Sequence, residues 1–225
     1  MTEAKYNFYF GRERDRSYKP SPIGDTLIQG CDTETIRALG ESVFSRFIDE
    51  YGSEEFNLIS FGTDRPKVNY ADISQNPKTY LVDSYEKMAY YVEAEAKIAA
   101  MHTKPTILSV AIFGEGDYGS TAKLIDVLTE ITKGYYGPTL YVVLITDSVF
   151  KEGYPAFDYI ITTYCGNEDG LKFYTETLEI PYDKKRTPRN SGQFLLTEVS
   201  YSDIRDMGAP LVISTELKYS AFIKK

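Results

Sequence analysis

The sequence predicts an α/β fold: a three-layer, mostly parallel, Rossmann-like sheet with helices on both faces. Short apolar runs alternate along the chain with amphipathic segments of helical period. Residues 106–113 and 140–146 are almost continuously apolar, which is typical of strands buried on both faces of a sheet. Strands that alternate with helices in this way favour parallel pairing through right-handed crossovers.

The N-terminal part of the chain supplies two predicted strands and one helix. Residues 6–10, YNFYF, form the first strand, and the polar segment 11–30 is predicted as a loop. Asp32 caps the helix that follows, and residues 56–61, FNLISF, form the next strand. The helix has one apolar face at helical spacing, made of Ile36, Leu39, Val43, Phe44, Phe47 and Ile48.

The remainder of the chain alternates more regularly. Helices are predicted at 78–101, 120–133 and 168–178, and strands at 106–113, 140–146 and 158–164. A second polar loop covers 181–192, and the tail mixes short helix and strand signals. Residues 1–225 are expected to form a single domain, because a chain of this length buries roughly 70% of its unfolded surface and needs no disulfide or metal staples.

Composition predicts a soluble, cytoplasmic protein. The net charge is −8 and the pI about 4.9, so the surface repels phosphate backbones and anionic membranes, and neither nucleic acid nor a membrane is expected as a partner. No signal peptide precedes the first apolar run, and no run reaches the ~18 residues of a membrane span. Cys31 and Cys165 have no metal-binding spacing, and a single histidine, His102, excludes most histidine-based catalytic sites.

Four loops are expected to meet at one crevice. In an open parallel sheet, ligands bind outside the carboxyl ends of the strands. The loops expected at those ends span residues 11–32, 62–67, 114–120 and 164–167. A ligand site is therefore expected where these segments, distant in sequence, come together.

The loop FGEGDYGS is the strongest local signal of such a site. Its glycines fit the pattern G-x-G-x-x-G at Gly114, Gly116 and Gly119. Ser120 caps the following helix, whose first backbone N–H groups offer an anion site. Glu115 and Asp117 repel a phosphate at this loop, unless they bind Mg²⁺ or point to solvent.

Three interpretations of the loop are open on the residues alone. A dinucleotide fingerprint follows the first strand and has an acidic residue about 20 residues on, whereas this loop is mid-chain and Asp147 follows it by ~30 residues. The Walker pattern G-x-x-x-x-G-K-[ST] is absent, so P-loop chemistry is not expected. The loop can also be a tight strand-to-helix turn that binds nothing.

The order of the loops resembles that of the FtsZ/tubulin family, in which a glycine-rich loop in mid-domain wraps the phosphates of GTP. FGEGDYGSTAKLIDVL is similar to that loop, which implies phosphate-binding roles for its three glycines and for Ser120 and Thr121. FNLISFGTDRPKV is similar to the family's strand and N-T-D loop through Thr63 and Asp64, with glycine in place of the Asn. IQGCDTETIRALGESVF is similar to the first glycine loop and helix through Gly30.

Downstream segments continue the resemblance. DYIITTYCGNEDGL is similar to the strand and loop that read the guanine base, which implies Asn167 as the base reader. LLTEVSYSDIRDMG is similar to the loop that enters the neighbouring subunit's nucleotide site and helps to activate water, which implies Asp203 as catalytic. Ser200 replaces this loop's other acidic residue, and Glu198 replaces its usual Asn. The family's second domain is expected to be missing.

The resemblance implies a cytoskeletal, FtsZ/tubulin-like protein that binds GTP or GDP with Mg²⁺. Since half of the acidic pair is lost, the chain is expected to be at most a weak GTPase. Self-association into a filament, or contact with a protein partner, is implied as well. Two alternatives stay open: a Rossmann-like enzyme that uses a dinucleotide or small nucleotide, with an acidic ribose reader near Asp147, and a protein-binding module without a ligand.

Overall fold

The computed structural model describes residues 6–12, 18–30, 33–52, 54–63, 78–114, 118–147, 155–163, 193–198 and 211–214. The helices within these residues are α1 (Thr33–Tyr51), α2 (Tyr85–Ala99) and α3 (Ala122–Thr132). The strands are β1 (Asn7–Arg12), β2 (Tyr18–Pro22), β3 (Thr26–Gln29), β4 (Asn57–Gly62), β5 (Lys78–Leu81), β6 (Thr106–Ile112), β7 (Leu140–Thr146), β8 (Tyr159–Thr163), β9 (Gln193–Glu198) and β10 (Leu211–Ser214).

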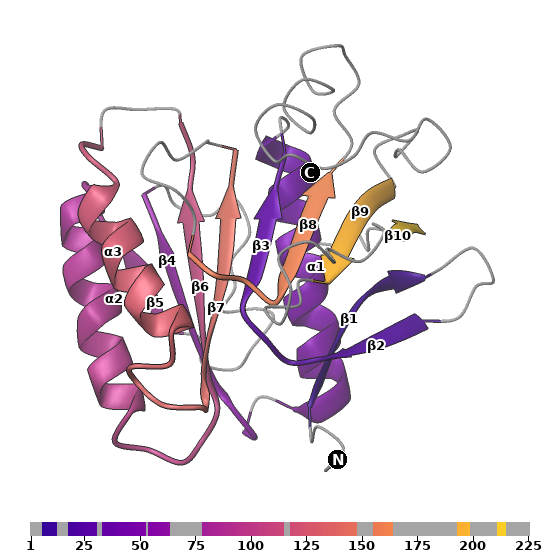
Figure 1. The fold of residues 1–225 in the computed structure, drawn as a ribbon, viewed down its shortest axis with the longest axis horizontal. Coiled ribbons are helices and arrows are strands. Elements are labelled where there is room, and N and C mark those ends of the chain that lie inside the picture. The colour runs from indigo at the N-terminus through magenta and orange to yellow at the C-terminus, as the bar shows by residue number, and fades with distance from the viewer. Residues whose placement is uncertain are drawn as a thin grey trace, which may run out of the picture.

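The described strands join one sheet in the order β2-β1-β10-β9-β8-β3-β7-β6-β4-β5 (Figure 1). Six neighbouring strands, from β8 to β5, pair in parallel. Beyond β8 the sheet continues through β9, β10, β1 and β2 by antiparallel pairing. The predicted α/β fold with a mostly parallel sheet is therefore confirmed.

Helices cover both faces of the parallel strands (Figure 1). α2 and α3 pack together on one face, over a core that includes Leu27 of β3 and Val142 of β7. α1 packs on the other face, over Ile28 and Val143 of the same strands. Because successive residues of a strand point to opposite faces, each buried strand contributes to both cores, as the three-layer prediction requires. None of the described helices is long and apolar enough to span a bilayer.

The predicted loop 11–30 is wrong, because it contains β2 and β3. β2 includes Pro20 and Pro22 and lies at the edge of the sheet, where a strand tolerates residues without an N–H donor. β3 has four residues, TLIQ, all of them buried, and is too short to show a period. The strand that the pattern missed is one of the central strands of the parallel sheet.

The predicted helix 78–101 divides into β5 and α2. Ser84 ends the strand pattern and caps the helix, since its hydroxyl accepts a hydrogen bond from the backbone N–H of Lys87 (3.3 Å). The predicted helix 120–133 is confirmed as α3 with slightly shorter bounds. The predicted helix 168–178 lies outside the described residues.

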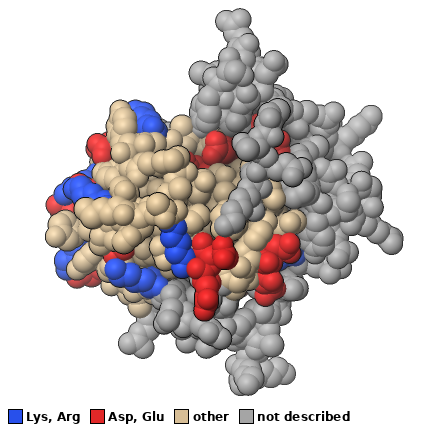
Figure 2. Space-filling view, turned by 90° about the horizontal axis from the view of Figure 1, so that it is seen from below, with Lys and Arg blue, Asp and Glu red and all other residues tan. Residues whose placement is uncertain are grey.

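At the amino ends of the central strands, Asp25 joins β3 to both of its neighbours. Its carboxylate accepts a hydrogen bond from the backbone N–H of Val142 in β7 (2.7 Å), and its own backbone N–H donates to the carboxylate of Asp158 (2.8 Å), directly before β8. Its carbonyl accepts from the backbone N–H groups of Asp158 and Tyr159. Figure 2 views the molecule from this end and shows acidic side chains gathered near the middle, with Lys and Arg mainly toward the α2 and α3 side.

Burial raises the pKa of the Asp25 carboxyl to about 7, because the charged form loses its hydration. The hydrogen bond from Val142 opposes this rise in pKa, and the negative charge of Asp158 adds to it. Between its ordinary pKa of 3.8 and about 7, the folded protein therefore holds a proton that the unfolded chain has lost. The free energy of unfolding must fall as the pH rises through this window.

Replacing Asp25 with Asn should flatten this pH dependence, because the amide stays neutral while its oxygen can still accept the hydrogen bond from Val142. Relative to the unchanged protein, Asp25→Asn should gain about 2–4 kcal/mol of unfolding free energy between about pH 4.5 and about pH 8. Urea denaturation at each pH measures this difference. Asp126→Asn, at an exposed position of α3, is the matched control and should keep the original pH profile. Parallel profiles for Asp25→Asn and the unchanged protein would contradict the assignment.

Candidate functional site

β3 brings the start of α1 to the carboxyl edge of the parallel strands. β3 lies between β7 and β8, and the connection 30–32 leads from Gln29 directly to Thr33, the first residue of α1. α1 leaves this edge along one face of the sheet, and α3, which follows β6, leaves along the other (Figure 1). Loops that diverge to opposite faces form the crevice in which open α/β sheets bind ligands.

Asp147 connects three chain segments at this edge. It follows β7 directly, and one of its carboxylate oxygens accepts a hydrogen bond from the hydroxyl of Thr33 (2.7 Å). The other oxygen accepts from the backbone N–H of Gly114 (2.8 Å), two residues after β6. The carboxylate therefore holds the start of α1 against the ends of β6 and β7.

Gly30 and Gln29 form the edge on the side of β8. A Cβ at Gly30 would lie 1.9 Å from the hydroxyl oxygen of Thr163 and 3.0 Å from Ile36, so only glycine lets the backbone pass between β8 and α1. Gln29 is fully buried, and its side-chain nitrogen donates to the hydroxyl of Thr162 (3.3 Å). Its Oε1 has no hydrogen-bond partner among the described residues, which makes it an acceptor that a water or a ligand donor would satisfy.

The start of α1 has little positive charge of its own. The connection 30–32 is Gly-Cys-Asp and contains no Lys or Arg. The first cation of α1 is Arg37, whose guanidinium carbon lies 4.1 Å from the centroid of the Phe113 ring, a cation–π contact at the end of β6. The sequence from Gly30 to Ile36 therefore brings no cationic side chain to the helix start.

The predicted phosphate loop instead begins α3, two strands away from β3. Gly114 and Gly119 are exposed, and Gly119 has a φ of 82°, a conformation that favours glycine. The hydroxyl of Ser120 accepts a hydrogen bond from the backbone N–H of Ala122 (3.2 Å), while Thr121, at the N-cap position, makes no side-chain capping bond. The Ser120 hydroxyl thus provides an acceptor for one backbone N–H at the start of α3. A nucleotide-binding role for this loop stays a prediction.

The remaining predicted site residues are placed only in part. Gly30 lies at the edge described above, and Thr63 is half-buried directly after β4. Their roles stay predictions, as do those of the residues that lie outside the described ranges: Asp64, Gly116, Asn167 and Asp203, together with Glu115 and Asp117.

Sequence reasoning missed Thr33 and considered Asp147 only as a ribose reader. The two residues are 114 positions apart, so no local spacing reveals their contact. A weaker signal was available in QGCDT, a glycine followed at three positions by a hydroxyl residue where a helix begins. This signal becomes visible only when TLIQ is recognised as a strand.

Thr33 and Asp147 fit a magnesium ion better than a metal site made of protein groups alone. In the part of the chain that the structure describes, no three His, Cys, Asp or Glu side chains are grouped to hold a metal. Mg²⁺ in nucleotide sites needs fewer protein ligands, because waters and substrate phosphates complete its octahedron. A threonine hydroxyl and a carboxylate are the protein ligands that P-loop NTPases provide for it.

Solved structures similar to this chain are ATPases. B204, the DNA-packaging ATPase from Sulfolobus Turreted Icosahedral Virus, superposes with a TM-score of 0.59 at 10% identity, covering 85% of this chain and 97% of that chain. EssC (ATPases 2 and 3) from Geobacillus thermodenitrificans gives 0.60 at 11% identity, covering 98% of this chain and 46% of that chain. The pCW3 conjugation coupling protein TcpA gives 0.58 at 8% identity, with coverages of 94% and 66%. At these identities the likeness shows that the chain shares their α/β fold. No family model matches it, and no curated protein matches its sequence.

The predicted relationship to the FtsZ/tubulin family is therefore wrong. That prediction rested on the order of loops along the chain, whereas the similar structures are ATPases and not members of that family. The GTP-binding, filament-forming function inferred from it is not supported, and neither alternative, the dinucleotide enzyme or the ligand-free module, matches better. Nucleotide binding and a Rossmann-like sheet do agree with the similar structures.

Two expectations based on single features also need correction. The missing Walker pattern argued against P-loop chemistry, yet the solved structures that share this chain's fold are P-loop NTPases. The negative charge argued against nucleic acid, but a DNA-packaging ATPase is among the similar structures, so net charge does not support that exclusion.

Asp147→Ala should loosen the carboxyl edge. The change leaves the Thr33 hydroxyl and the Gly114 N–H without their acceptor, which should lower the free energy of unfolding by about 1–3 kcal/mol. Asp147→Asn keeps one accepting oxygen and should cost about half as much. Hydrogen exchange provides the specific measurement, because the Gly114 amide should exchange faster in Asp147→Ala. An unchanged exchange rate at Gly114 would show that the hydrogen bond does not hold this edge.

Proposed function

We propose that the chain binds an adenine nucleotide with Mg²⁺ at the start of α1 and hydrolyses it slowly. The contact between Thr33 and Asp147 carries the proposal. P-loop NTPases hold Mg²⁺ with the Ser or Thr of the phosphate loop and with a Walker-B aspartate. Thr33 and Asp147 are the same two ligand types, and they meet where the helix after a central strand begins.

Similar structures support an adenine rather than a guanine nucleotide. The genome packaging NTPase B204 from Sulfolobus turreted icosahedral virus 2 was solved in complex with AMP and with ATP-gammaS, and TcpA with ATPgS. The 19 residues of α1 add a helix N-terminus at the crevice, whose dipole favours phosphate. The nucleotide phosphates would lie over the connection 30–32.

Acidic residues around this helix start make the divalent ion essential to the proposal. Asp32 and Glu34 flank Thr33 in sequence, and Asp147 contacts it. These carboxylates repel a triphosphate alone, whereas Mg²⁺ between them and the phosphates inverts the local charge balance. Binding should therefore depend strongly on Mg²⁺.

Slow hydrolysis is expected because the connection 30–32 lacks the cation of a Walker-A loop. The Walker-A lysine lies against the β- and γ-phosphates and stabilises charge in the transition state. The connection 30–32 has no lysine, and Arg37 is engaged with the Phe113 ring. Since electrostatic stabilisation is usually the largest part of catalysis, turnover should lie far below the ~10 s⁻¹ typical of enzymes.

Titration calorimetry of nucleotide-free protein tests the proposal. Mg²⁺ with ATP should bind, GTP should bind no more tightly, and ATP without Mg²⁺ should bind at least about tenfold more weakly. Thr33→Val keeps the side-chain shape but removes the hydroxyl, and should weaken binding about fivefold or more. Ser120→Ala removes the matching hydroxyl at the start of α3 and should leave binding unchanged.

Three results would overturn the proposal: no binding of ATP at about 1 mM, equal binding with and without Mg²⁺, or a loss in Ser120→Ala with none in Thr33→Val. The last result would assign the nucleotide to the glycine-rich loop. Thermal unfolding of each ligand-free variant confirms that a lost affinity is not lost folding. Phosphate release measured on the same samples reports the rate of hydrolysis.

A further inference from the structure

Arg37 brings a positive charge to the carboxyl edge from within α1. It follows Thr33 by one helical turn, which is about 6 Å along the axis and about 40° around it, so both side chains leave the same side of the helix. Helical side chains tilt toward the N-terminus of their helix, and Arg37 is therefore directed back toward Thr33. Its guanidinium carbon lies 4.1 Å from the centroid of the Phe113 ring, and Phe113 directly follows β6.

Phe113 places this charge beside the candidate magnesium ligands. The next residue, Gly114, donates its backbone N–H to Asp147 (2.8 Å), and the same carboxylate accepts from the hydroxyl of Thr33 (2.7 Å). The ring beneath Arg37 is thus one residue away from the amide that holds Asp147. Segments from α1, β6 and β7 meet here, although they are far apart in the sequence.

The contact with the Phe113 ring does not cancel the charge of Arg37. An aromatic ring attracts a cation through its quadrupole and supplies no counter-ion. A guanidinium stays charged at every pH at which proteins fold, and its five N–H donors lie in one plane. This planar fork matches the geometry of phosphate oxygens.

Glu41, one turn further along α1, is only a partial counter-ion for Arg37. Burial raises the pKa of the Glu41 carboxyl to about 7, although the charge of Arg37 acts to lower it. A carboxyl with this pKa is protonated in about half of the molecules at neutral pH. The cation of Arg37 therefore keeps much of its attraction for an anion at the carboxyl edge.

We propose that Arg37 binds the β- or γ-phosphate of the nucleotide and thereby makes the site prefer ATP to AMP. This inference rests on the proposed function, in which Thr33 and Asp147 hold Mg²⁺. The metal bridges the β- and γ-phosphates of a bound nucleotide, so an arginine beside its two protein ligands faces these phosphates and not the single phosphate of AMP. Because the Phe113 ring holds the guanidinium at the end of β6, Arg37 contributes affinity and leaves hydrolysis slow.

Titration calorimetry of the whole chain with Mg²⁺ tests this role. Arg37→Gln removes the charge and should weaken ATP binding about tenfold or more, because a charge-assisted hydrogen bond to phosphate is lost. Its affinity for AMP should stay within about twofold of that of the unchanged chain. Phosphate release at saturating ATP should not change, which separates a contribution to affinity from one to catalysis.

Lys123→Gln is the matched control. Lys123 is exposed at the second position of α3, another helix that begins at the carboxyl edge, so its loss removes one positive charge of the same edge. This variant should bind ATP like the unchanged chain. Thermal unfolding of ligand-free Arg37→Gln checks that a lower affinity is not lost folding, since this variant also loses the contact with Phe113.

Full affinity for ATP in Arg37→Gln, or an equal loss in Lys123→Gln, would overturn the role of Arg37. An equal loss of ATP and AMP affinity would overturn it as well, and where AMP binds too weakly to measure, the ATP result and its control decide. Failure of the proposed function differs, because the unchanged chain then binds no ATP. Loss of binding in Thr33→Val with none in Arg37→Gln keeps the proposed function and rejects this inference.

Discussion

The position of β3 between β7 and β8 is the constraint on which the rest of the molecule depends. The strand has only four residues, and it forms parallel ladders on both sides. A carboxylate reinforces each end: Asp25 bonds to the backbone of β7 at the amino end, and Asp147 holds the helix that leaves the carboxyl end. Once β3 is in place, α1 begins at the crevice, Gly30 passes close to β8, and β8 carries the antiparallel strands outward. A short buried strand has few ladder bonds of its own, so these end contacts are a large part of what positions it.

Where the sequence predicted the fold well, a strong period or a long apolar run was available. β6 and β7 are seven-residue apolar strands, and α3 has a clear apolar face, so all three were recognised. β2 and β3 were missed for a different physical reason. Prolines are compatible with β2 only because it is an edge strand, and TLIQ is a strand only because two partners pair with it. Both depend on tertiary neighbours, which a local sequence pattern does not contain.

The candidate site shows which contacts hold the start of α1 in place. In the described residues, the start of α1 is held by the Thr33 hydroxyl, the Asp147 carboxylate and the close passage of Gly30 past Thr163. None of these contacts needs a lysine in the connection before the helix. Contacts that stabilise a fold can therefore be separate from the groups that carry out chemistry on it. For the same reason the fold is recognisable by comparison of structures although the Walker pattern is absent from the sequence.

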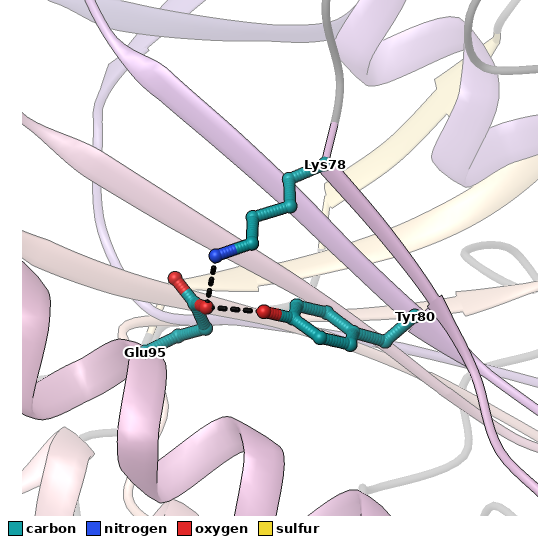
Figure 3. A network of polar contacts seen from close by, with 3 residues as sticks. All are labelled: Lys78, Tyr80 and Glu95. Atoms are coloured by element: carbon teal, nitrogen blue, oxygen red, sulfur yellow. Dashed lines mark hydrogen bonds and ion pairs between the residues drawn. The ribbon is translucent and has the colours of Figure 1, made fainter.

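The starts of α1 and α2 are linked through the residues that flank the glycine-rich segment between β6 and α3. The hydroxyl of Tyr85, the first residue of α2, donates to the carbonyl of Phe113 (2.7 Å), and its backbone N–H donates to the carbonyl of Tyr118 (2.9 Å). Gly114, next to Phe113, donates to Asp147, which in turn accepts from Thr33. The start of α2 is thus joined to the start of α1 by consecutive hydrogen bonds and the chain between them. Any movement of α2 must therefore either keep Tyr85 in this position or break bonds to both ends of the glycine-rich segment. Glu95, which is buried on α2 and accepts hydrogen bonds from Lys78 and Tyr80 of β5 (Figure 3), holds α2 against the sheet and so favours the first outcome.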